Sequence, residues 1–206
     1  MTKEILVFPH RDFKTHCEVL KNSSFAELRL DIHRYTHKEY EELLALPIQW
    51  IVSFREEEHV EHLDFFLSQR PSYIDLDFSL ISLFFVEKIN NAGSTCIVSY
   101  HGFYQTPSEG RLYELWKQCK RTGAQIIKLV FEAKALEDNK KLLFLYGFDS
   151  HLIAFNMGEL GKESRIYAAL QGEQMIYLAP DGFMPLAAGQ LTMSEWKQIK
   201  EKLCLK

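Results

Sequence analysis

The feature that most constrains the fold is a regular alternation of short β-type runs with amphipathic helical stretches. Eight runs rich in β-branched and aromatic residues predict strands, at 4–8, 25–32, 48–54, 73–76, 95–100, 125–130, 152–156 and 174–178. Helical patterns separate them, at 38–46, 59–69, 80–90, 108–122, 134–146, 162–170 and 194–203, with a weaker one at 11–21. One helix after each strand predicts an α/β protein, a compact (β/α)8 or TIM barrel. A doubly wound parallel sheet is the alternative, although no strand is followed by a glycine-rich phosphate turn.

Length and composition restrict the class of protein. No linker, repeat or low-complexity segment divides the 206 residues, so we expect a single barrel domain over residues 1–206. The formal net charge of -4 and the absence of a basic run argue against nucleic acid as a partner. The first apolar run ends at Pro9, too short for a signal peptide, and no segment approaches the length of a membrane span. We therefore expect a cytoplasmic protein without membrane contact, and the four scattered cysteines are expected to be reduced core thiols.

Charged residues recur at every second position in two of the predicted strands. Glu27, Arg29 and Asp31 share one face, and Asp75 and Asp77 share another. In an isolated strand this pattern indicates a half-exposed face. In a barrel, helices cover the outer face, so the charges must point into the lumen and pair or bind something there. Two further strands end in polar residues, and because barrel enzymes place their chemistry at the carboxyl ends of the strands, the pattern predicts a polar pocket there.

Lys128 is the most informative of these residues. It interrupts the apolar run IIKLV at 126–130, although lysine is among the residues least often fully buried. One interpretation is structural, with the stem packed inward and the amine paired or solvated. The functional interpretation is an amine whose pKa is lowered by burial and neighbouring arginines, so that it attacks a ketone or aldehyde. The iminium that forms needs a general base for the adjacent carbon, and His101 is the candidate.

With these residues in place, the chain resembles type I 3-dehydroquinate dehydratase over nearly its whole length. The segment ELRLD at 27–31 is similar to the family's E-x-R-x-D strand, and SYHGF at 99–103 resembles the segment with the catalytic histidine. GAQIIK at 123–128 resembles the segment with the Schiff-base lysine, and MGELGKESR at 157–165 the one that ends in the substrate-binding arginine. AGQ at 188–190 resembles the end of the last active-site loop. The motifs occur in the family's order, and that order makes the resemblance specific.

The resemblance implies that the chain dehydrates 3-dehydroquinate to 3-dehydroshikimate in the shikimate pathway, as a lyase without a metal or cofactor. By resemblance, Lys128 attacks the ring ketone, and His101 removes the C2 proton and protonates the departing C1 hydroxyl. Arg165 is expected to bind the substrate carboxylate. The residues expected to bind substrate are Glu27, Arg29, Arg55, Arg165, Gln190, Met157 and Phe103. Gln190 is expected to close over the ligand, and a homodimer is one assembly that the resemblance leaves open.

Two segments depart from the family pattern. The family has a glutamate, oriented toward the catalytic histidine, four residues after the strand-three arginine and just before two glycines. Here the segment REEEHV at 55–60 places His59 at that position and Glu58 one residue before it. These two residues are therefore the candidates for orienting His101. In the last loop, Leu186 replaces a serine and Ala188 a proline.

Other functions share parts of this pattern. A different Schiff-base lyase, of aldolase type, would need Lys128 but neither His101 at this spacing nor the pair of Arg165 and Gln190. A weakly active or non-catalytic binding derivative of the family remains an alternative because of Leu186 and the altered segment at Glu58 and His59. Histidines spaced as helix ligand pairs, at 33 and 37 and at 59 and 62, are interpreted as ordinary surface residues, so no metal site is predicted.

Overall fold

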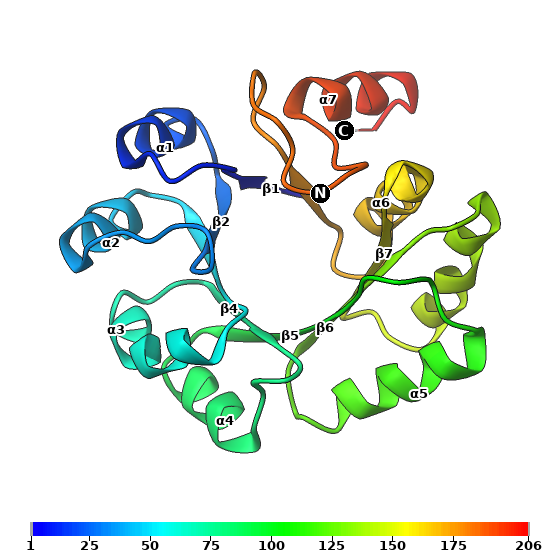
Figure 1. Ribbon diagram of the computed structural model, residues 1–206, viewed down its shortest axis with the longest axis horizontal. Coiled ribbons are helices and arrows are strands. Elements are labelled where there is room, and N and C mark those ends of the chain that lie inside the picture. The colour runs from blue at the N-terminus through cyan, green and yellow to red at the C-terminus, as the bar shows by residue number, and fades with distance from the viewer. Residues whose placement is uncertain (1, 206) are drawn as a thin grey trace.

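The computed structural model describes residues 2–205 and contains eight parallel strands in a nearly closed barrel surrounded by helices (Figure 1). This confirms the predicted TIM-type barrel, and the doubly wound alternative is wrong. The strands are β1 (Lys3–Val7), β2 (Phe25–Arg29), β3 (Gln49–Phe54), β4 (Tyr73–Asp77), β5 (Thr95–Gly102), β6 (Ile126–Glu132), β7 (Leu152–Met157) and β8 (Met175–Leu178). Each overlaps a run that the sequence predicts.

The sheet order is β7-β6-β5-β4-β3-β2-β1-β8, so consecutive strands are neighbours and β1 also pairs with β8. Strands β7 and β8 stand at the two ends of this order. A backbone hydrogen bond from Glu173 N–H to the Leu152 carbonyl, at 3.1 Å, joins the chain just before β8 to the start of β7. Between β7 and β8, the barrel is therefore closed by this backbone contact and not by a continuous ladder of strand hydrogen bonds.

The helices lie outside the strands, one helical segment after each strand (Figure 1). They are α1 (Phe13–Leu20), α2 (His37–Leu44), η1 (Glu57–His62) with α3 (Leu63–Ser68), α4 (Leu83–Asn91), α5 (Glu109–Lys120), η2 (Leu136–Gly147), η3 (Glu159–Gly161) with α6 (Lys162–Leu170), and α7 (Met193–Lys202). Two predicted helices differ in type, since η1 and η2 are 3₁₀ helices. An apolar periodicity between three and four residues is compatible with either helix, so the sequence does not separate them.

Side chains alternate between the lumen of the barrel and the layer beneath the helices. In β3, Trp50, Val52 and Phe54 pack in the outer layer, whereas Ile51 belongs to the separate lumen cluster. The lower lumen is filled by apolar residues that include Ile5, Ile97, Ile126, Ile153 and Met175. A packed lower lumen leaves space only toward the carboxyl ends of the strands, which is where the polar side chains lie.

The buried histidines correct one expectation. His33 is fully buried, so its interpretation as a surface histidine is wrong. Its Nε2–H donates to the carbonyl oxygen of Phe8 at 2.9 Å, and its Nδ1 accepts the Arg29 N–H at 3.1 Å. It therefore ties the end of β1 to the end of β2. His16 is also fully buried, 4.6 Å from His33 between ring centroids, and contacts the Tyr35 hydroxyl through Nδ1.

This histidine pair is expected to make the folded protein less stable in mild acid. Burial, with the neighbouring His33, lowers the pKa of His16 to about 3, and burial lowers the pKa of His33 to about 4. The unfolded chain binds protons on both side chains near their usual pKa of about 6.5. The free energy of unfolding therefore falls as the pH drops below 6.5, with a limiting slope of about 1.4 kcal/mol per pH unit for each histidine.

Urea unfolding at several pH values from about 7 down to 5 measures this dependence, above the range in which most carboxylates titrate. In His16→Leu, the slope of the unfolding free energy against pH is expected to be smaller by the contribution of one histidine. An identical slope in that variant would show that His16 is not a source of the acid sensitivity.

The cysteine expectation holds in part. Cys96 and Cys119 are buried in the core and Cys17 is half-buried, whereas Cys204 is exposed, so it is not a core thiol. All four are free cysteines. Within residues 2–205, no helix has the length and apolar character needed to cross a membrane.

Candidate active site

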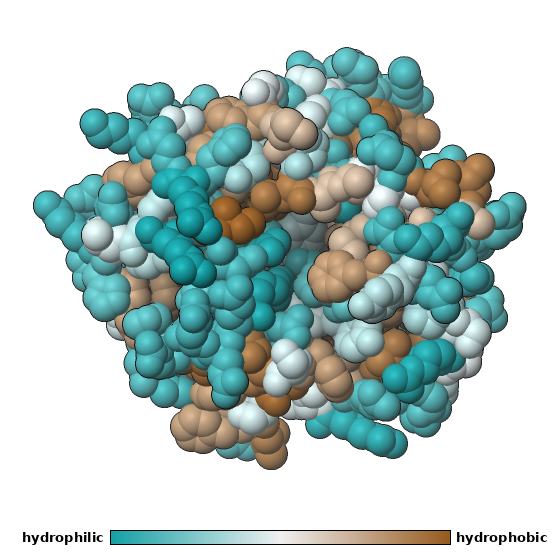
Figure 2. All heavy atoms as spheres, in the orientation of Figure 1, coloured by the Kyte–Doolittle hydropathy of each residue, from teal (hydrophilic) through white to brown (hydrophobic). Residues whose placement is uncertain are grey.

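A cavity of about 390 Å³ lies at the carboxyl ends of the strands. Its lining includes all nine residues that the sequence assigns to catalysis or substrate binding: Glu27, Arg29, Arg55, His101, Phe103, Lys128, Met157, Arg165 and Gln190. Figure 2 shows the surface hollowed at the centre of the barrel, with many hydrophilic residues around the hollow. The volume suits a small molecule. The structure thus brings these nine predictions together in one place.

Lys128 is 4% exposed, and its side chain ends among two carboxylates and an aromatic ring. Its Nζ lies 3.2 Å from Asp75 Oδ2, 3.9 Å from Glu27 Oε1 and 3.9 Å from the centroid of the Tyr177 ring. Burial lowers the pKa of Lys128, and the positive charge of Arg55 adds to this, while the two carboxylates oppose it. The amine is therefore held in place as a cation but loses its proton more readily than an exposed lysine.

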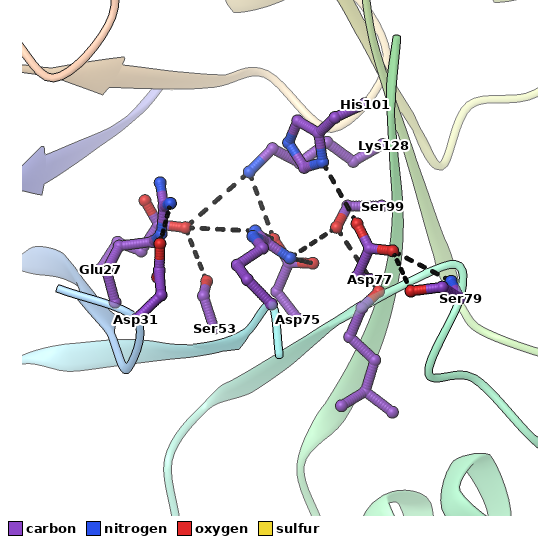
Figure 3. A network of polar contacts seen from close by, with 12 residues as sticks. Glu27, Asp31, Ser53, Asp75, Asp77, Ser79, Ser99, His101 and Lys128 are labelled. Atoms are coloured by element: carbon purple, nitrogen blue, oxygen red, sulfur yellow. Dashed lines mark hydrogen bonds and ion pairs between the residues drawn. The ribbon is translucent and has the colours of Figure 1, made fainter. Parts of the chain in front are cut away.

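Arg55 is the centre of a polar network next to the amine. Figure 3 shows Glu27, Asp75 and Ser99, the side chains that Arg55 contacts. Its guanidinium donates to both oxygens of Asp75, at 2.9 and 2.6 Å, and to the Ser99 hydroxyl at 2.7 Å, and it lies 3.6 Å from Glu27. Glu27 also accepts a 2.6 Å hydrogen bond from Ser53. Burial opposes ionisation of Asp75, but the adjacent cations outweigh it and hold the pKa of Asp75 far below its usual range. One bidentate contact with Asp75 and one hydrogen bond to Ser99 fix Arg55, so the surroundings of the amine are rigid.

His101 lies on β5, and its pairing partner on β6 is Val130, one step along the cavity from Lys128. Its Nδ1 lies 3.6 Å from Asp77 Oδ2, and its ring stacks on Phe103 with centroids 6.2 Å apart. Burial lowers the pKa of His101 to about 4, and the Asp77 carboxylate acts against this shift. His101 is therefore neutral near pH 7 and can accept a proton.

Arg165 is a buried cation that forms no ion pair within the described part of the chain. It is 5% exposed, its guanidinium carbon lies 4.6 Å from the centroid of the Phe155 ring, and its buried Nε has no hydrogen-bond partner. Within residues 2–205, no carboxylate lies within 4.0 Å of its guanidinium nitrogens. Burial alone lowers the pKa of Arg165 to about 10. Burying an unpaired charge is costly, so this arrangement suits an anionic ligand in the adjacent cavity.

The last loop reaches the cavity through Gln190. Gly189 has φ +72° and a Cβ there would lie 2.1 Å from the Gly158 carbonyl oxygen, so only glycine fits where the loop crosses the end of β7. The Gln190 side chain accepts from the Leu186 N–H at 3.0 Å and donates to the Tyr177 carbonyl at 3.4 Å. Its amide is thus used to shape its own loop, and Leu186 presents an apolar side chain to the cavity.

The remaining predicted contacts differ in exposure. Arg29 donates two hydrogen bonds to Asp31, at 2.9 and 2.7 Å, so that its guanidinium is already paired. Phe103 is 69% exposed and Met157 is half-buried, and both lie at the mouth of the cavity. These side chains form the border of the cavity and not its floor.

Glu58 and His59 do not lie in this cavity. Both line a separate one of about 330 Å³ on the outside of the barrel. Glu58 lies 3.6 Å from Arg34, and His59 lies 3.6 Å from Glu58 and 3.8 Å from Glu56. The structure does not bring Glu58 or His59 to His101, so the orienting role that the sequence suggests for them is corrected: η1 directs both toward Arg34 and Glu56 in the separate cavity. The group of Glu56, Glu58 and His59 has ligand atoms within 4.8 Å of one another, but Arg34 already supplies positive charge to both glutamates.

Comparisons with known proteins give the family. The family model described as type I 3-dehydroquinase matches residues 10–203. The chain belongs to the type I 3-dehydroquinase family. It is 36% identical over 199 residues to a 3-dehydroquinate dehydratase of Pyrococcus abyssi, covering 90% of this chain and 91% of that protein. A 3-dehydroquinate dehydratase of Dehalococcoides mccartyi is 33% identical over 196 residues, with 88% of each chain covered.

Solved structures of type I 3-dehydroquinases and their relatives share the barrel. The 3-dehydroquinate dehydratase of Aquifex aeolicus superposes with a TM-score of 0.81 at 25% identity, over 96% of this chain and 97% of that one. The enzyme of Geobacillus kaustophilus superposes with a TM-score of 0.82 at 19% identity, over 99% and 91% of the two chains. The second likeness is evidence for the fold alone.

Three side chains of this type I 3-dehydroquinase site were not assigned a role from the sequence. Asp75 and Asp77 alternate along β4 and were expected only to share a face, while Tyr177 sits in an apolar strand. The period-two pattern places the two aspartates in the lumen, but their partners depend on the register of β4 with β3 and β5. No sequence signal distinguishes Tyr177 from an ordinary core tyrosine.

Proposed function

We propose that this chain is a 3-dehydroquinate dehydratase that forms a Schiff base between Lys128 and its substrate. The observation that carries the proposal is the buried Lys128 amine, which opens on the same cavity as His101 and Arg165. A buried amine, a neutral imidazole and a cation without an anion are the groups that a dehydration of a small keto acid needs. We also propose that residues 1–206 act as one domain.

The Lys128 amine acts as the nucleophile. After losing its proton, it adds to the ring ketone, and loss of water from the carbinolamine gives an iminium. The iminium draws electrons from the adjacent carbon and so acidifies its proton. Glu27 and Asp75 lie within 4 Å of Nζ, so they stabilise the positive charge that returns when the iminium forms.

His101 moves the protons. Its neutral ring takes the C2 proton, the electron pair left behind forms the new double bond, and the C1 hydroxyl leaves with a proton returned by the same ring. Hydrolysis of the product imine by water then releases the enone and restores the Lys128 amine. Each group ends the cycle in the state in which it began.

The substrate is held by charge at one end and by polar contacts at the other. Arg165 binds the carboxylate, because its guanidinium is the cation of the cavity without an ion pair among the described residues. Glu27, Arg29 and Arg55 contact the ring hydroxyls across the cavity. Met157 and Phe103 limit its width. This arrangement fits a small polyhydroxylated anion better than an uncharged sugar or a polymer.

The proposal is tested by following product and adduct together. The protein is mixed with dehydroquinate, and the absorbance of the enone product is followed. A second sample receives borohydride, which reduces the imine, and the adduct is located by mass spectrometry. We expect an absorbance rise and a single adduct on Lys128. An adduct without an enone favours a lyase of aldolase type, and neither signal at high protein concentration favours a binding derivative.

Replacing His101 separates imine formation from proton transfer. In His101→Ala, turnover is expected to fall on the order of 100-fold, the lower end of what a positioned general acid–base provides. The imine still forms, more slowly, because Lys128 and the carboxylate anchor remain. Borohydride trapping against time measures the imine, and enone absorbance measures turnover. Wild-type turnover in this variant would show that another group is the base.

A further inference from the structure

The His101 ring needs a neighbouring group that orients it. A base on a cavity wall must keep one ring nitrogen unprotonated and aimed at the substrate. The two residues that the sequence offered for this task, Glu58 and His59, line another cavity. A different group must therefore hold the ring.

Asp77 reaches His101 from the neighbouring strand. In the parallel register of β4 with β5, Asp77 is opposite Ser99, and His101 is two residues further along the same face. Alternate residues of a strand share one face, so the strands themselves place Asp75, Asp77, Ser99 and His101 in the lumen, independently of the loops. The contact of 3.6 Å between Asp77 Oδ2 and His101 Nδ1 follows from strand pairing, so the barrel itself fixes it.

The Asp77 carboxylate is in turn held by its own loop (Figure 3). Its Oδ1 accepts from the Ser79 N–H at 3.0 Å and from the Ser79 hydroxyl at 2.7 Å. These bonds use one carboxylate oxygen and leave the other for the histidine. Burial raises the pKa of Asp77, but the contacts with His101 and Ser79 outweigh it and keep the group ionised. An ionised acceptor beside Nδ1 selects the tautomer with hydrogen on Nδ1 and leaves Nε2 free.

We propose that Asp77 is the positioning residue of His101, holding the ring through Nδ1–H so that Nε2 serves as the base. This inference rests on the proposed function. Asp77 lines the cavity beside His101, and it acts through the imidazole. The separation exceeds that of a neutral hydrogen bond, and it shortens when the ring takes up a proton and the pair becomes charge-assisted. The carboxylate therefore stabilises the imidazolium that proton abstraction creates.

The charged groups that face His101 come from β4, from β6 and from the residue that follows β3. Asp75 and Asp77 on β4 favour the protonated ring, whereas Arg55 just after β3 and Lys128 on β6 disfavour it. Asp75 forms ion pairs with Arg55 and Lys128, so replacing it would also disturb the surroundings of the lysine. Replacing Asp77 changes the charge next to the His101 ring and leaves those ion pairs intact.

Asp77→Asn is the decisive variant. Asparagine keeps the shape, and its amide oxygen can still accept from Ser79, but its NH₂ group faces Nδ1 and favours the tautomer with hydrogen on Nε2. We expect kcat to fall roughly 30- to 100-fold with KM changed by less than about threefold, because only the proton transfers are impaired. The acid limb of the kcat profile is expected to move to lower pH. Asp77→Glu keeps the charge and should restore part of kcat.

Two matched controls accompany this variant. Asp12→Asn alters an aspartate that also accepts from a nearby hydroxyl, that of Thr15, but faces no histidine. His59→Gln alters the residue at the family's orienting position. Both are expected to keep kcat within about twofold, since neither lies in the cavity. A loss in His59→Gln equal to that in Asp77→Asn would overturn the proposal, as would an unchanged kcat and pH profile in Asp77→Asn.

A measurement without substrate separates this inference from the proposed function. Nuclear magnetic resonance of the ring signals of His101 reports its pKa and tautomer in the folded protein. Asp77→Asn is expected to lower that pKa and to shift the ring toward the Nε2–H form. If the wild-type protein made no product but this shift occurred, the proposed function would fail while the contact stood. If turnover and the Lys128 adduct were normal but the ring signals were unmoved, the positioning role would fail alone.

Discussion

Lys128→Met is expected to lose turnover by roughly 10⁴-fold or more, since no other group in the cavity can supply the nucleophile. Methionine keeps the length and the apolar stem of lysine and removes only the amine. The fold is expected to remain, because Asp75 still receives two hydrogen bonds from Arg55 and Glu27 still receives one from Ser53. Enone absorbance measures turnover, and borohydride trapping is expected to give no adduct.

The matched control is Lys134→Met, just beyond the same strand. The Lys134 side chain is 60% exposed and its Nζ lies 3.9 Å from Glu132. It is expected to retain turnover within about twofold, as surface substitutions usually do. Dehydroquinate should still raise the melting temperature of Lys128→Met, because the carboxylate anchor is intact. Substantial turnover in Lys128→Met, or an adduct on Lys134, would show that the reaction does not pass through Lys128.

The sequence predicted the parts of this molecule that depend on local periodicity. All eight strands and the barrel follow from alternating strand and helix patterns, and the lumen positions of Glu27 and Lys128 follow from a period of two. A single charged residue in an apolar strand was informative because the barrel leaves it only one direction to point. Apolar periodicity does not predict whether the helix after β3 or β6 is an α-helix or a 3₁₀ helix, because the two patterns overlap.

Contacts between strands were predicted less well, because they depend on register. The sequence showed that Asp77 shares a face with Asp75, but only the pairing of β4 with β5 brings it to His101. The spacing of the family motif indicates Glu58 or His59 as the residue that orients His101, but the positions of both depend on the path of η1. Tyr177 gave no signal at all, and its ring lies 3.9 Å from the Lys128 amine.

Arg165→Met is expected to make the protein more stable and far less active. The guanidinium is buried against Phe155 without an ion pair among the described residues, and its lowered pKa, about 10, reflects the cost of that burial. Methionine fills similar space without a charge. Replacing buried ionic groups with apolar ones has stabilised proteins by about 1–4 kcal/mol, so we expect a higher urea midpoint in the absence of ligand. Loss of the carboxylate contact is expected to lower kcat/KM on the order of 1,000-fold, mostly through KM.

The two effects separate a binding role from a structural one. If Arg165 served the fold, its loss would lower the urea midpoint, and the fall in activity would follow from unfolding. If it serves the ligand, dehydroquinate raises the melting temperature of the wild type and leaves that of Arg165→Met almost unchanged. Arg165→Lys keeps the charge but not the planar fork, so it is expected to recover only part of the lost affinity. Wild-type KM in Arg165→Met would assign the carboxylate to another residue of the cavity, and the stability gain alone would not rescue the role proposed for this arginine.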